Sequence, residues 1–539
     1  MPFRAAGIIT VIALLALLGA GIHRAGVAET FSDPVSHIRA QDESVYANGA
    51  LTMATEGGWL TPKFMGRYML FKPPLLVWIS ALSLKLWERS VLALRLPILL
   101  IGAAATWLLI WWSYQAHSLW SAAAAGLLLI ANPLWHTFSR LCYTDMLVTA
   151  AVVWAMFTLW RDMELATWGS AGQFGLAVAA GIMSKSVAGI LPIPVLALFC
   201  LLARRRIPAG LWKALGIALL LIAPWHIYQM FVHGHWFWTE YVQVQLLGFG
   251  LHPPSPAEPA VPFYLKRLVW TDPVLCLFVI LALPFLLRAV REHEREALLL
   301  LSWLVVVAIS LAAFQFRNIP YLVQLIPPLC LIATAYIPSF SAKFGKVTVV
   351  ALAAVFCVKL VSGAPVWGIS YGVSTPLPSA AALHWYSSLS RSNQLIAVNT
   401  DDQFSASVMP IRTVHYVFID PTGAALAVAP HYRFLGLALT AAEFQQLKTL
   451  EPLYRRRLED WGLDSTEPLA TAVFANSAEE VAAMVLTHPD SDFYLPETLR
   501  GVVLRKPEAA HRLVPLATSR FFLLAIDSSP SQSKKASLE

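Results

Sequence analysis

Long apolar runs separated by short polar stretches dominate the first two thirds of the chain. Apolar runs of roughly 12 to 22 residues predict helices that cross a membrane. In chain order these runs are residues 5–22, 91–112, 119–135, 146–160, 174–190, 191–202, 211–232, 273–287, 297–314, 319–337 and 347–361. A further run at 75–87, followed by charged residues, predicts a helix lying in the membrane interface. The pattern predicts a polytopic α-helical membrane protein with about eleven spans.

The pattern changes after residue 361. Pro, Ser and Gly residues predict a linker at 364–379, and strand-like and helix-like pieces then alternate from 380 to 527. The predicted strands are 395–398, 414–419, 471–474 and 521–526, and the predicted helices are 441–457 and 477–486. A Ser- and Lys-rich tail at 528–539 is predicted to be disordered. The expected organisation is a transmembrane domain (1–363), the linker, a compact α/β domain and the tail.

Composition agrees with a membrane protein. Only 13% of the residues are charged, against about 25% in soluble domains. The formal net charge of +7 arises largely beside the apolar runs, where positive loops face the cytoplasm. Residues 5–22 could be a signal peptide, since residues 25–28 resemble a cleavage site, but the later spans favour a retained helix.

If the N-terminus lies in the cytoplasm, the predicted spans assign each charged loop to the cytoplasmic or the outer side of the membrane. Arg161 and the basic runs at 204–206, 288–295 and 343–346 fall on the cytoplasmic side. The outer side receives Asp42, Lys72, Asp145, His235 and Arg317. The positive charge therefore indicates membrane topology, and no nucleic-acid partner is expected.

The first outer loop, residues 28–90, crowds charged and aromatic residues beside apolar sequence. Asp42 and Glu43 precede Tyr46, and Lys72 stands before a double proline that stiffens its backbone. A carboxylate can take a proton from a hydroxyl, and a fixed ammonium can hold an anionic leaving group. The alternative is a solvated loop whose charges only avoid the lipid.

Further candidate residues lie at the ends of later spans. Asp145 heads the 146–160 span, where helix capping alone could explain it. Lys185 interrupts an apolar stretch and Arg317 lies at a predicted outer helix junction; each could be an interfacial anchor. Together, Lys72, Lys185 and Arg317 suit a phosphate at the outer leaflet.

An aromatic run at 234–241 opens a proline-rich outer loop. It contains His235 and Glu240, and its rings could line a carbohydrate or lipid site or form an interfacial belt. None of the five cysteines has metal-ligand spacing, and no Gly-rich nucleotide loop, zinc motif or serine elbow is present. No metal site is predicted from these motifs.

These motifs, in their order, resemble the polytopic glycosyltransferases that use polyprenyl-phosphate sugars. That group includes protein O-mannosyltransferases and lipid A aminoarabinose transferases, and its fold is called GT-C. The matching motifs are Asp42-Glu43-x-x-Tyr46, Lys72-Pro73-Pro74, Arg95-Leu96-Pro97, Thr144-Asp145, Ser184-Lys185-Ser186 and, more loosely, the sequence around Arg317 and Tyr321. Phe71 and Val45 depart from the family pattern, which has an acidic residue and an arginine there.

The resemblance implies a GT-C membrane domain with interfacial helices in the first outer loop and a periplasmic α/β domain, in the bacterial inner membrane. It implies that Asp42 is the base, assisted by Glu43, and that Lys72, Lys185 and Arg317 bind the donor phosphate. Asp145 would orient the acceptor or hold a divalent ion, although no cofactor is required. The remaining expected pocket residues are Tyr46, Tyr321, His235 and Glu240.

The resemblance also implies the partners: a polyprenyl-phosphate sugar, membrane lipids, and an envelope acceptor such as lipid A, a glycan or a secreted protein. Attack at the anomeric carbon would invert its configuration. Two alternatives remain open. A lipid-linked sugar transporter would need ionisable residues near the membrane centre and repeated halves. A degenerate relative would bind polyprenyl phosphate without catalysis.

Overall fold

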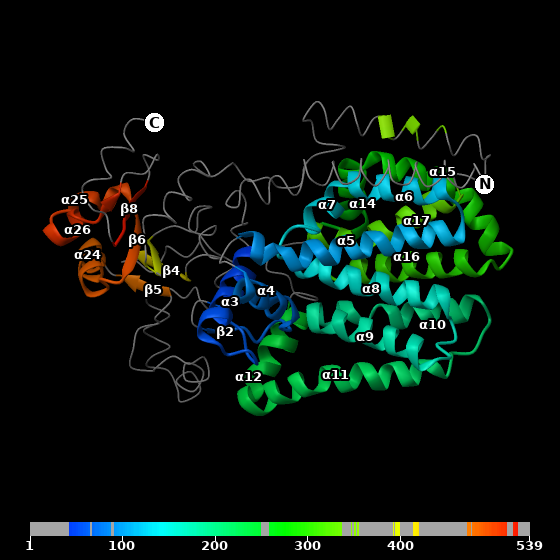
Figure 1. Ribbon diagram of the computed structural model, residues 1–539, viewed down its shortest axis with the longest axis horizontal. Coiled ribbons are helices and arrows are strands. Elements are labelled where there is room, and N and C mark those ends of the chain that lie inside the picture. The colour runs from blue at the N-terminus through cyan, green and yellow to red at the C-terminus, as the bar shows by residue number, and fades with distance from the viewer. Residues whose placement is uncertain are drawn as a thin grey trace. The chain divides into compact units, whose positions relative to one another are not determined.

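The computed structural model describes most of the first 336 residues and parts of the C-terminal region (Figure 1). The described residues are 42–64, 67–87, 91–248, 258–336, 394–398, 413–419, 472–475, 477–514 and 521–526, with a few isolated positions between 347 and 392. The chain divides into two compact units. The first unit comprises Met1–Ser32, Leu70–Leu76 and Arg95–Gly372; the second comprises Asp33–Met69, Val77–Leu94 and Val373–Glu539.

Helices account for almost all of the described part of the first unit. They are α5 (Val91–Ala116), α6 (Leu119–Ala131), α7 (Pro133–Phe138), α8 (Thr144–Arg161), α9 (Trp168–Lys185), α10 (Pro192–Leu202), α11 (Gly210–His233), α12 (His235–Trp238), the π-helix η3 (Thr239–Gly248), α14 (Ala260–Thr271), α15 (Pro273–Arg291), α16 (Arg295–Ala313) and α17 (Ile326–Tyr336), with 3₁₀ helices η2 (Ser186–Ile190) and η4 (Ile319–Leu325). Among the described residues, five helical stretches are long and apolar enough to cross a membrane. The predicted spans at 5–22 and 347–361 lie outside the continuously described residues.

The predicted span 119–135 is wrong as a single helix, because the chain breaks at Asn132. The Asn132 side chain accepts a hydrogen bond from the Trp135 amide (2.9 Å) and donates one to Asp272 (2.8 Å). Pro133 follows at the first position of α7, where a missing amide hydrogen costs nothing. Asp272 is fully buried and also caps α15 through the Leu275 amide. Burial raises the pKa of the Asp272 carboxyl, and its hydrogen bonds to Leu275, Asn132 and Val274 oppose that rise.

Two other predicted spans each combine an α-helix with a 3₁₀ helix. The span predicted at 174–190 begins earlier, at Trp168, and passes from α9 into the 3₁₀ helix η2 after Lys185. Ser186 has φ of 49°, a left-handed conformation that costs energy for a residue with a Cβ. The span predicted at 319–337 likewise opens as η4 before α17 begins.

Glycines allow the helices around α9 to approach one another closely. A Cβ on Gly175 would lie 2.4 Å from the Ala214 carbonyl oxygen of α11, and one on Gly189 would lie 2.0 Å from the Gly181 carbonyl carbon. Small residues of this kind let membrane helices bring their backbones together. The close contact fixes where α9 ends relative to its neighbours.

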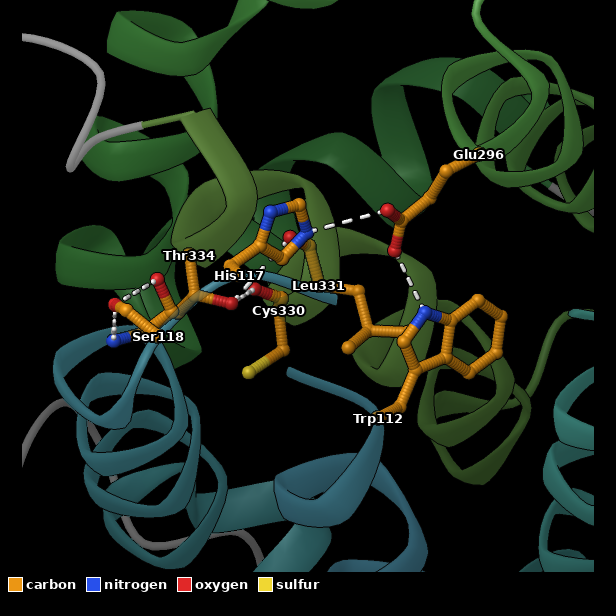
Figure 2. A network of polar contacts seen from close by, with 8 residues as sticks. Trp112, His117, Ser118, Glu296, Cys330, Leu331 and Thr334 are labelled. Atoms are coloured by element: carbon orange, nitrogen blue, oxygen red, sulfur yellow. Dashed lines mark hydrogen bonds and ion pairs between the residues drawn. The ribbon is translucent and has the colours of Figure 1, made fainter. Parts of the chain in front are cut away.

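The polar contacts drawn in Figure 2, together with a stack of buried aromatic rings, tie α5 to α16. The Trp112 indole donates to Glu296 (2.6 Å), and His117 lies 3.3 Å from the second Glu296 oxygen. The Trp112 ring, which is fully buried, stacks on Trp160 of α8 at 5.3 Å and on Trp303 of α16 at 6.4 Å. Glu296 also lies in the first turn of α16, where the helix dipole favours a carboxylate.

The charged loops of the first unit gather at two opposite ends of α8. At its C-terminal end, Arg295 donates to the Leu159 and Trp160 carbonyls, and Arg205 pairs with Glu164 at 3.6 Å. Asp145 and Lys185 meet at the other end. This division agrees with the predicted grouping of charges on two sides, although the structure assigns neither side to a compartment.

The second unit contains the helices and strands of the first outer loop. They are α3 (Asp42–Glu56), a hairpin of β1 (Lys63–Phe64) and β2 (Arg67–Tyr68), and most of α4 (Leu75–Leu86). The Trp78 indole of α4 donates to the Trp59 carbonyl (2.5 Å), and the Lys85 ammonium lies 5.9 Å from the Trp59 ring centre. The helix predicted at 75–87 is therefore present.

A six-stranded mixed sheet occupies the described C-terminal part of the second unit. Its order is β5-β4-β3-β6-β8-β7, with β3 (Gln394–Val398), β4 (Thr413–Ile419), β5 (Ala472–Ala475), β6 (Ser491–Pro496), β7 (Leu513–Val514) and β8 (Phe521–Leu524). β3, β4, β5 and β6 are parallel neighbours, and β8 is antiparallel to β6 and β7. α24 (Ala478–Thr487) packs its Val481 and Val485 into the core with Phe493. Four strands and this helix confirm predicted segments; the helix predicted at 441–457 lies outside the described residues.

Replacing Gly175 by alanine tests the close helix contact. We expect Gly175→Ala to lower the melting temperature of the detergent-purified protein, because the new methyl group would overlap the α11 backbone and force the helices apart, at a cost of about 1–3 kcal/mol. Gly172→Ala in the same helix is the matched control, since no atom lies within 4 Å of its added Cβ. Equal melting temperatures for both variants would contradict the contact.

Replacing Glu296 by alanine tests the network in Figure 2. We expect Glu296→Ala to destabilise the protein by about 1–3 kcal/mol in thermal unfolding, because the buried Trp112 donor loses its acceptor. Glu292→Ala is the control; its exposed pair with Arg288 should contribute less than about 1 kcal/mol. An equal effect of the two substitutions would count against the network.

Candidate active site

Asp145 is held at the start of α8, within the first helical turn. Asp145 is only 3% exposed, and the positive end of the α8 dipole stabilises its carboxylate. The neighbouring backbone is well ordered by hydrogen bonding, since Thr149 donates to the Asp145 carbonyl at 2.7 Å. A buried carboxylate still needs a counter-charge, because helix ends alone do not replace its lost hydration.

Lys185 supplies that counter-charge from the last residue of α9. Its ammonium forms an ion pair with the Asp145 carboxylate, and the two side chains are 13% and 4% exposed. The lysine nitrogen also lies 4.3 Å from the centre of the Tyr321 ring on η4, a cation–π distance. The structure therefore brings together three predicted site residues, Asp145, Lys185 and Tyr321, from three separate segments.

Arg317 lies immediately before η4 and is partly buried. One of its Nη atoms donates to the Leu311 carbonyl at 3.2 Å. Its Nε is buried and has no hydrogen-bond partner among the described residues. Electrostatic coupling connects it to Tyr264 of α14, which also interacts with Asp145. Arg317 lies four positions before Tyr321 in the chain, and no ion pair joins it to an acidic residue among those the structure describes.

Tyr264 is a neighbour of the site that the sequence did not single out. It is 7% exposed and stands in a proline-rich segment whose helix, α14, was not predicted. The one local signal was the Pro-rich start followed by apolar residues at helical spacing. Its nearness to residues 50 and more positions away along the chain could not be inferred from that signal.

Two rings of the aromatic run at 234–241 lie in the core. Phe237 and Tyr241 are buried and stack on each other at 4.9 Å, against Trp225 and His226 of α11. The Tyr241 hydroxyl is 3.1 Å from His226 Nε2. Burial raises the pKa of Tyr241 to about 12, and a neighbouring Ser186 hydroxyl opposes the rise. Tyr241 thus belongs to the aromatic cluster around His226.

The predicted pocket residues of this run stay predictions. Glu240 is 9% exposed within the π-helix η3, and a π-helix of this length is rare in proteins. His235 begins α12. Trp238, by contrast, is 52% exposed, as an interfacial belt residue would be.

The candidate residues of the first outer loop lie on or beside α3 and α4. Asp42 is the first residue of α3. Glu43 and Tyr46 are buried in the same helix, and Lys72 is half-buried just before α4. The last three all take part in side-chain or backbone interactions. The α3 residues belong to the second unit, so their roles stay predictions.

A hollow lies at the C-terminal end of α8, away from the Asp145–Lys185 pair. It has a volume of about 420 Å³ and is lined by Trp111, Gln115, Trp160 and Arg161. Within the described part of the chain, no three His, Cys, Asp or Glu side chains are grouped to hold a metal ion. A divalent ion at Asp145 therefore stays a prediction.

The chain matches the family model of dolichyl-phosphate-mannose-protein mannosyltransferases over residues 71–228. It is 24% identical, over 316 residues, to the undecaprenyl phosphate-alpha-4-amino-4-deoxy-L-arabinose arabinosyl transferase of Enterobacter sp. (strain 638), covering 54% of each chain. It is 26% identical over 319 residues to an uncharacterized protein of Aquifex aeolicus (strain VF5), covering 56% of this chain and 60% of that one. The chain thus spans between half and two thirds of the length of these relatives.

The solved structures extend this likeness to the whole chain. The structure of ArnT from Cupriavidus metallidurans bound to undecaprenyl phosphate superposes with a TM-score of 0.63 at 16% identity, covering 96% of this chain and 98% of ArnT. The apo state of the same protein gives 0.60 at 15% identity, with 97% and 98% covered. The chain therefore has a GT-C membrane fold, and it resembles the glycosyltransferases that use polyprenyl-phosphate sugars.

Proposed function

We propose that this protein is an integral membrane glycosyltransferase that moves a sugar from a polyprenyl-phosphate donor to an acceptor in the cell envelope. The observation that carries the proposal is the buried Asp145–Lys185 ion pair beneath the Tyr321 ring, in a chain with the GT-C fold. Buried ion pairs are costly to form in an apolar environment and are more often retained for function than for stability.

A lipid-linked donor accounts for the chemistry that the sequence lacks. The sugar–phosphate bond already carries the energy for transfer, so neither a nucleotide cradle nor an ATP motif is needed. One curated relative is named for an undecaprenyl phosphate-linked arabinose, and the ArnT structure contains undecaprenyl phosphate. By that likeness, the donor here is a sugar on a polyprenyl phosphate, which reaches the site by lateral diffusion within the membrane.

The proposed reaction is a single inverting displacement. Asp42, assisted by Glu43, takes the proton from an acceptor hydroxyl or phosphate. The freed oxygen forms a bond to the anomeric carbon of the sugar while the bond from that carbon to the phosphate oxygen breaks. The electron pair of the broken bond remains on the polyprenyl phosphate, which leaves with one more negative charge.

Cationic side chains stabilise that growing charge. We assign this role to Lys72, which precedes the stiff Pro73-Pro74 backbone, and to Arg317, which donates to the Leu311 carbonyl. Lys185 contributes through its pair with Asp145, which holds the carboxylate in one orientation for the acceptor. Recognition of the sugar and acceptor is assigned to Tyr46, Tyr321, His235 and Glu240.

The site faces the periplasm of the bacterial inner membrane, and the α/β sheet of the second unit recognises the acceptor. That acceptor is lipid A, another envelope glycan or a secreted protein. A lipid-linked sugar transporter is the alternative activity, which the comparisons do not favour. A relative that binds polyprenyl phosphate without turning it over is the other alternative, motivated by Phe71 and Val45.

Mass spectrometry of polyprenyl-phosphate sugars, lipid A and envelope glycoproteins tests the transferase activity in cells. Deletion cells carrying Asp42→Asn or Asp145→Asn should accumulate one lipid-linked sugar and lose one envelope modification, because transfer stops while donor synthesis continues. We expect activity losses of about 100-fold or more for a missing general base.

Asp490→Asn serves as the control, since Asp490 lies in an exposed turn of the second unit. Wild type and this variant should restore the modification equally. Normal transfer by Asp42→Asn would remove Asp42 as the base. A deletion that changes neither lipid nor glycan would instead favour the binding or transport alternatives.

A double-mutant cycle separates the structural and chemical roles of the ion pair. Lys185→Met leaves the Asp145 carboxylate buried without its counter-charge and should destabilise the protein by about 3–5 kcal/mol. Combining it with Asp145→Asn should recover most of that stability, as measured by thermal unfolding in detergent. Activity should not return in the double variant.

The Tyr321→Phe variant is the reference for this cycle, because phenylalanine keeps the aromatic ring that the Lys185 ammonium contacts. Its stability should change by less than about 1 kcal/mol. Strictly additive losses from the two charge substitutions would mean that the pair does not couple. Recovery of transfer in the double variant would remove Asp145 from the reaction.

A further inference from the structure

The hollow at the C-terminal end of α8 is a site that the proposed transfer reaction does not use. Its volume of about 420 Å³ falls within the range of small-molecule sites, roughly 300–1,000 Å³. Trp111 and Gln115 reach it from α5, and Trp160 and Arg161 reach it from α8. These four residues bring two indole rings, one amide and one cation to the hollow. None of them is acidic.

One wall of the hollow is fixed by aromatic packing behind it. The Trp160 ring stacks on the fully buried Trp112 ring at 5.3 Å, and Trp112 is itself held by its hydrogen bond to Glu296. The Phe157 ring lies 5.7 Å from the Trp160 ring and 6.0 Å from the Arg161 guanidinium. A ligand entering the hollow would therefore not have to order this wall, which lowers the entropic cost of binding.

Arg161 brings an exposed positive charge to the hollow. The acidic residues that follow it in the chain have other partners. The Asp162 carboxylate accepts a hydrogen bond from the Ser170 hydroxyl at 2.6 Å, and Glu164 pairs with Arg205 at 3.6 Å. A guanidinium is permanently charged, and its planar set of donors suits a phosphate. The charge at the hollow therefore favours an anion.

The C-terminal end of α8 would by itself repel an anion, because the last carbonyl groups of a helix carry partial negative charge. Arg295 of α16 offsets this repulsion, since its guanidinium donates to the Leu159 and Trp160 carbonyls. Two arginines thus lie at this end of the helix. Arg295 satisfies the helix carbonyls, and Arg161 lines the hollow.

An exposed aromatic row on α5 continues from the hollow. The Trp111 ring lies 5.9 Å from the Trp107 ring and 5.9 Å from the Tyr114 ring, and the three side chains are 39–52% exposed. The stretch Leu92–Ala116 is long and apolar enough to cross a membrane, so Trp107 lies one helical turn deeper in it than Trp111. Exposed Trp and Tyr rings at the end of a span are typical of the membrane interface. A ligand that joins an anionic group to apolar chains matches this arrangement.

We propose that the hollow binds the head group of an anionic phospholipid. Arg161 and Gln115 donate to its phosphate, the Trp111 and Trp160 rings contact its glycerol part, and its acyl chains run along Trp107 into the bilayer. The topology predicted from the sequence places this end of α8 on the cytoplasmic side, where basic pockets between helices bind acidic lipids. The site is separate from the ion pair at the other end of α8 and does not depend on the transferase activity.

Binding of two phospholipids with identical acyl chains tests the site. Phosphatidylglycerol and phosphatidylethanolamine are titrated against the detergent-purified full-length protein, with binding measured by native mass spectrometry. Wild type should bind phosphatidylglycerol about ten-fold more tightly, because the ammonium of the other lipid would lie beside Arg161. Arg161→Gln should remove that preference, an effect of about one hydrogen bond between charged groups. Arg161→Lys should retain part of it, since the charge remains.

Arg288→Gln is the matched control, because it removes one exposed positive charge from a loop predicted on the same side of the membrane. It should leave the preference unchanged. Trp111→Ala should weaken both phospholipids by a similar factor, since the ring contacts parts that they share. Lipid-free wild type and Arg161→Gln should unfold at the same temperature, because the Arg161 side chain is exposed.

Several results would overturn the proposal. Wild type without a preference for phosphatidylglycerol would contradict an anion site, and equal losses from Arg161→Gln and Arg288→Gln would reduce the preference to general surface charge. Unchanged binding by Trp111→Ala would move the lipid away from the hollow, and a clearly lower melting temperature of Arg161→Gln would give Arg161 a structural role. Displacement by inorganic phosphate would identify a site for a free anion, and displacement by undecaprenol would assign the hollow to a polyprenyl chain. Each of these results leaves the proposed transferase activity standing.

Discussion

The structure of the first unit depends on how a carboxylate and an ammonium are kept charged in a mostly apolar helical bundle. Each charge alone would be expensive to bury, and their attraction offsets that cost only in a well-defined geometry. The α8 N-terminus, the end of α9 and the η4 ring provide that geometry at Asp145, Lys185 and Tyr321. The 3₁₀ turn after Lys185 and the glycine contacts of α9 position the end of that helix beside Asp145.

The features that the sequence predicted correctly are those encoded locally. Asp145 heads a span because Thr144 and the following apolar run mark a helix start, and α8 begins at Thr144. The strand 395–398 and its neighbours follow from short β-branched and aromatic runs. The membrane class followed from the long apolar runs and the scarcity of charged residues.

The features that were missed depend on partners far away in sequence. Asn132 breaks a helix because it bonds Asp272, 140 positions later. The β6 strand was missed because Asp492 interrupts its apolar pattern, yet Asp492 is fully buried and accepts a hydrogen bond from the Ile526 amide. The sequence motifs identified Asp145, Lys185 and Tyr321 as candidate site residues. They could not show that Lys185 forms an ion pair with Asp145. Tyr264 had no motif, so only the folded chain connects it to the site.

The length of α8 sets the distance between the features at its two ends. Its 18 residues rise about 27 Å, close to the roughly 30 Å hydrocarbon thickness of a bilayer. Asp145 and the Arg161-lined hollow mark the two ends of that length. The helix therefore holds the Asp145–Lys185 pair and the Arg161-lined hollow apart by about the thickness of a hydrocarbon layer. A ligand group seated at the ion pair and one seated in the hollow could not touch each other, so the two ends of α8 must recognise separate molecules or distant parts of one long molecule.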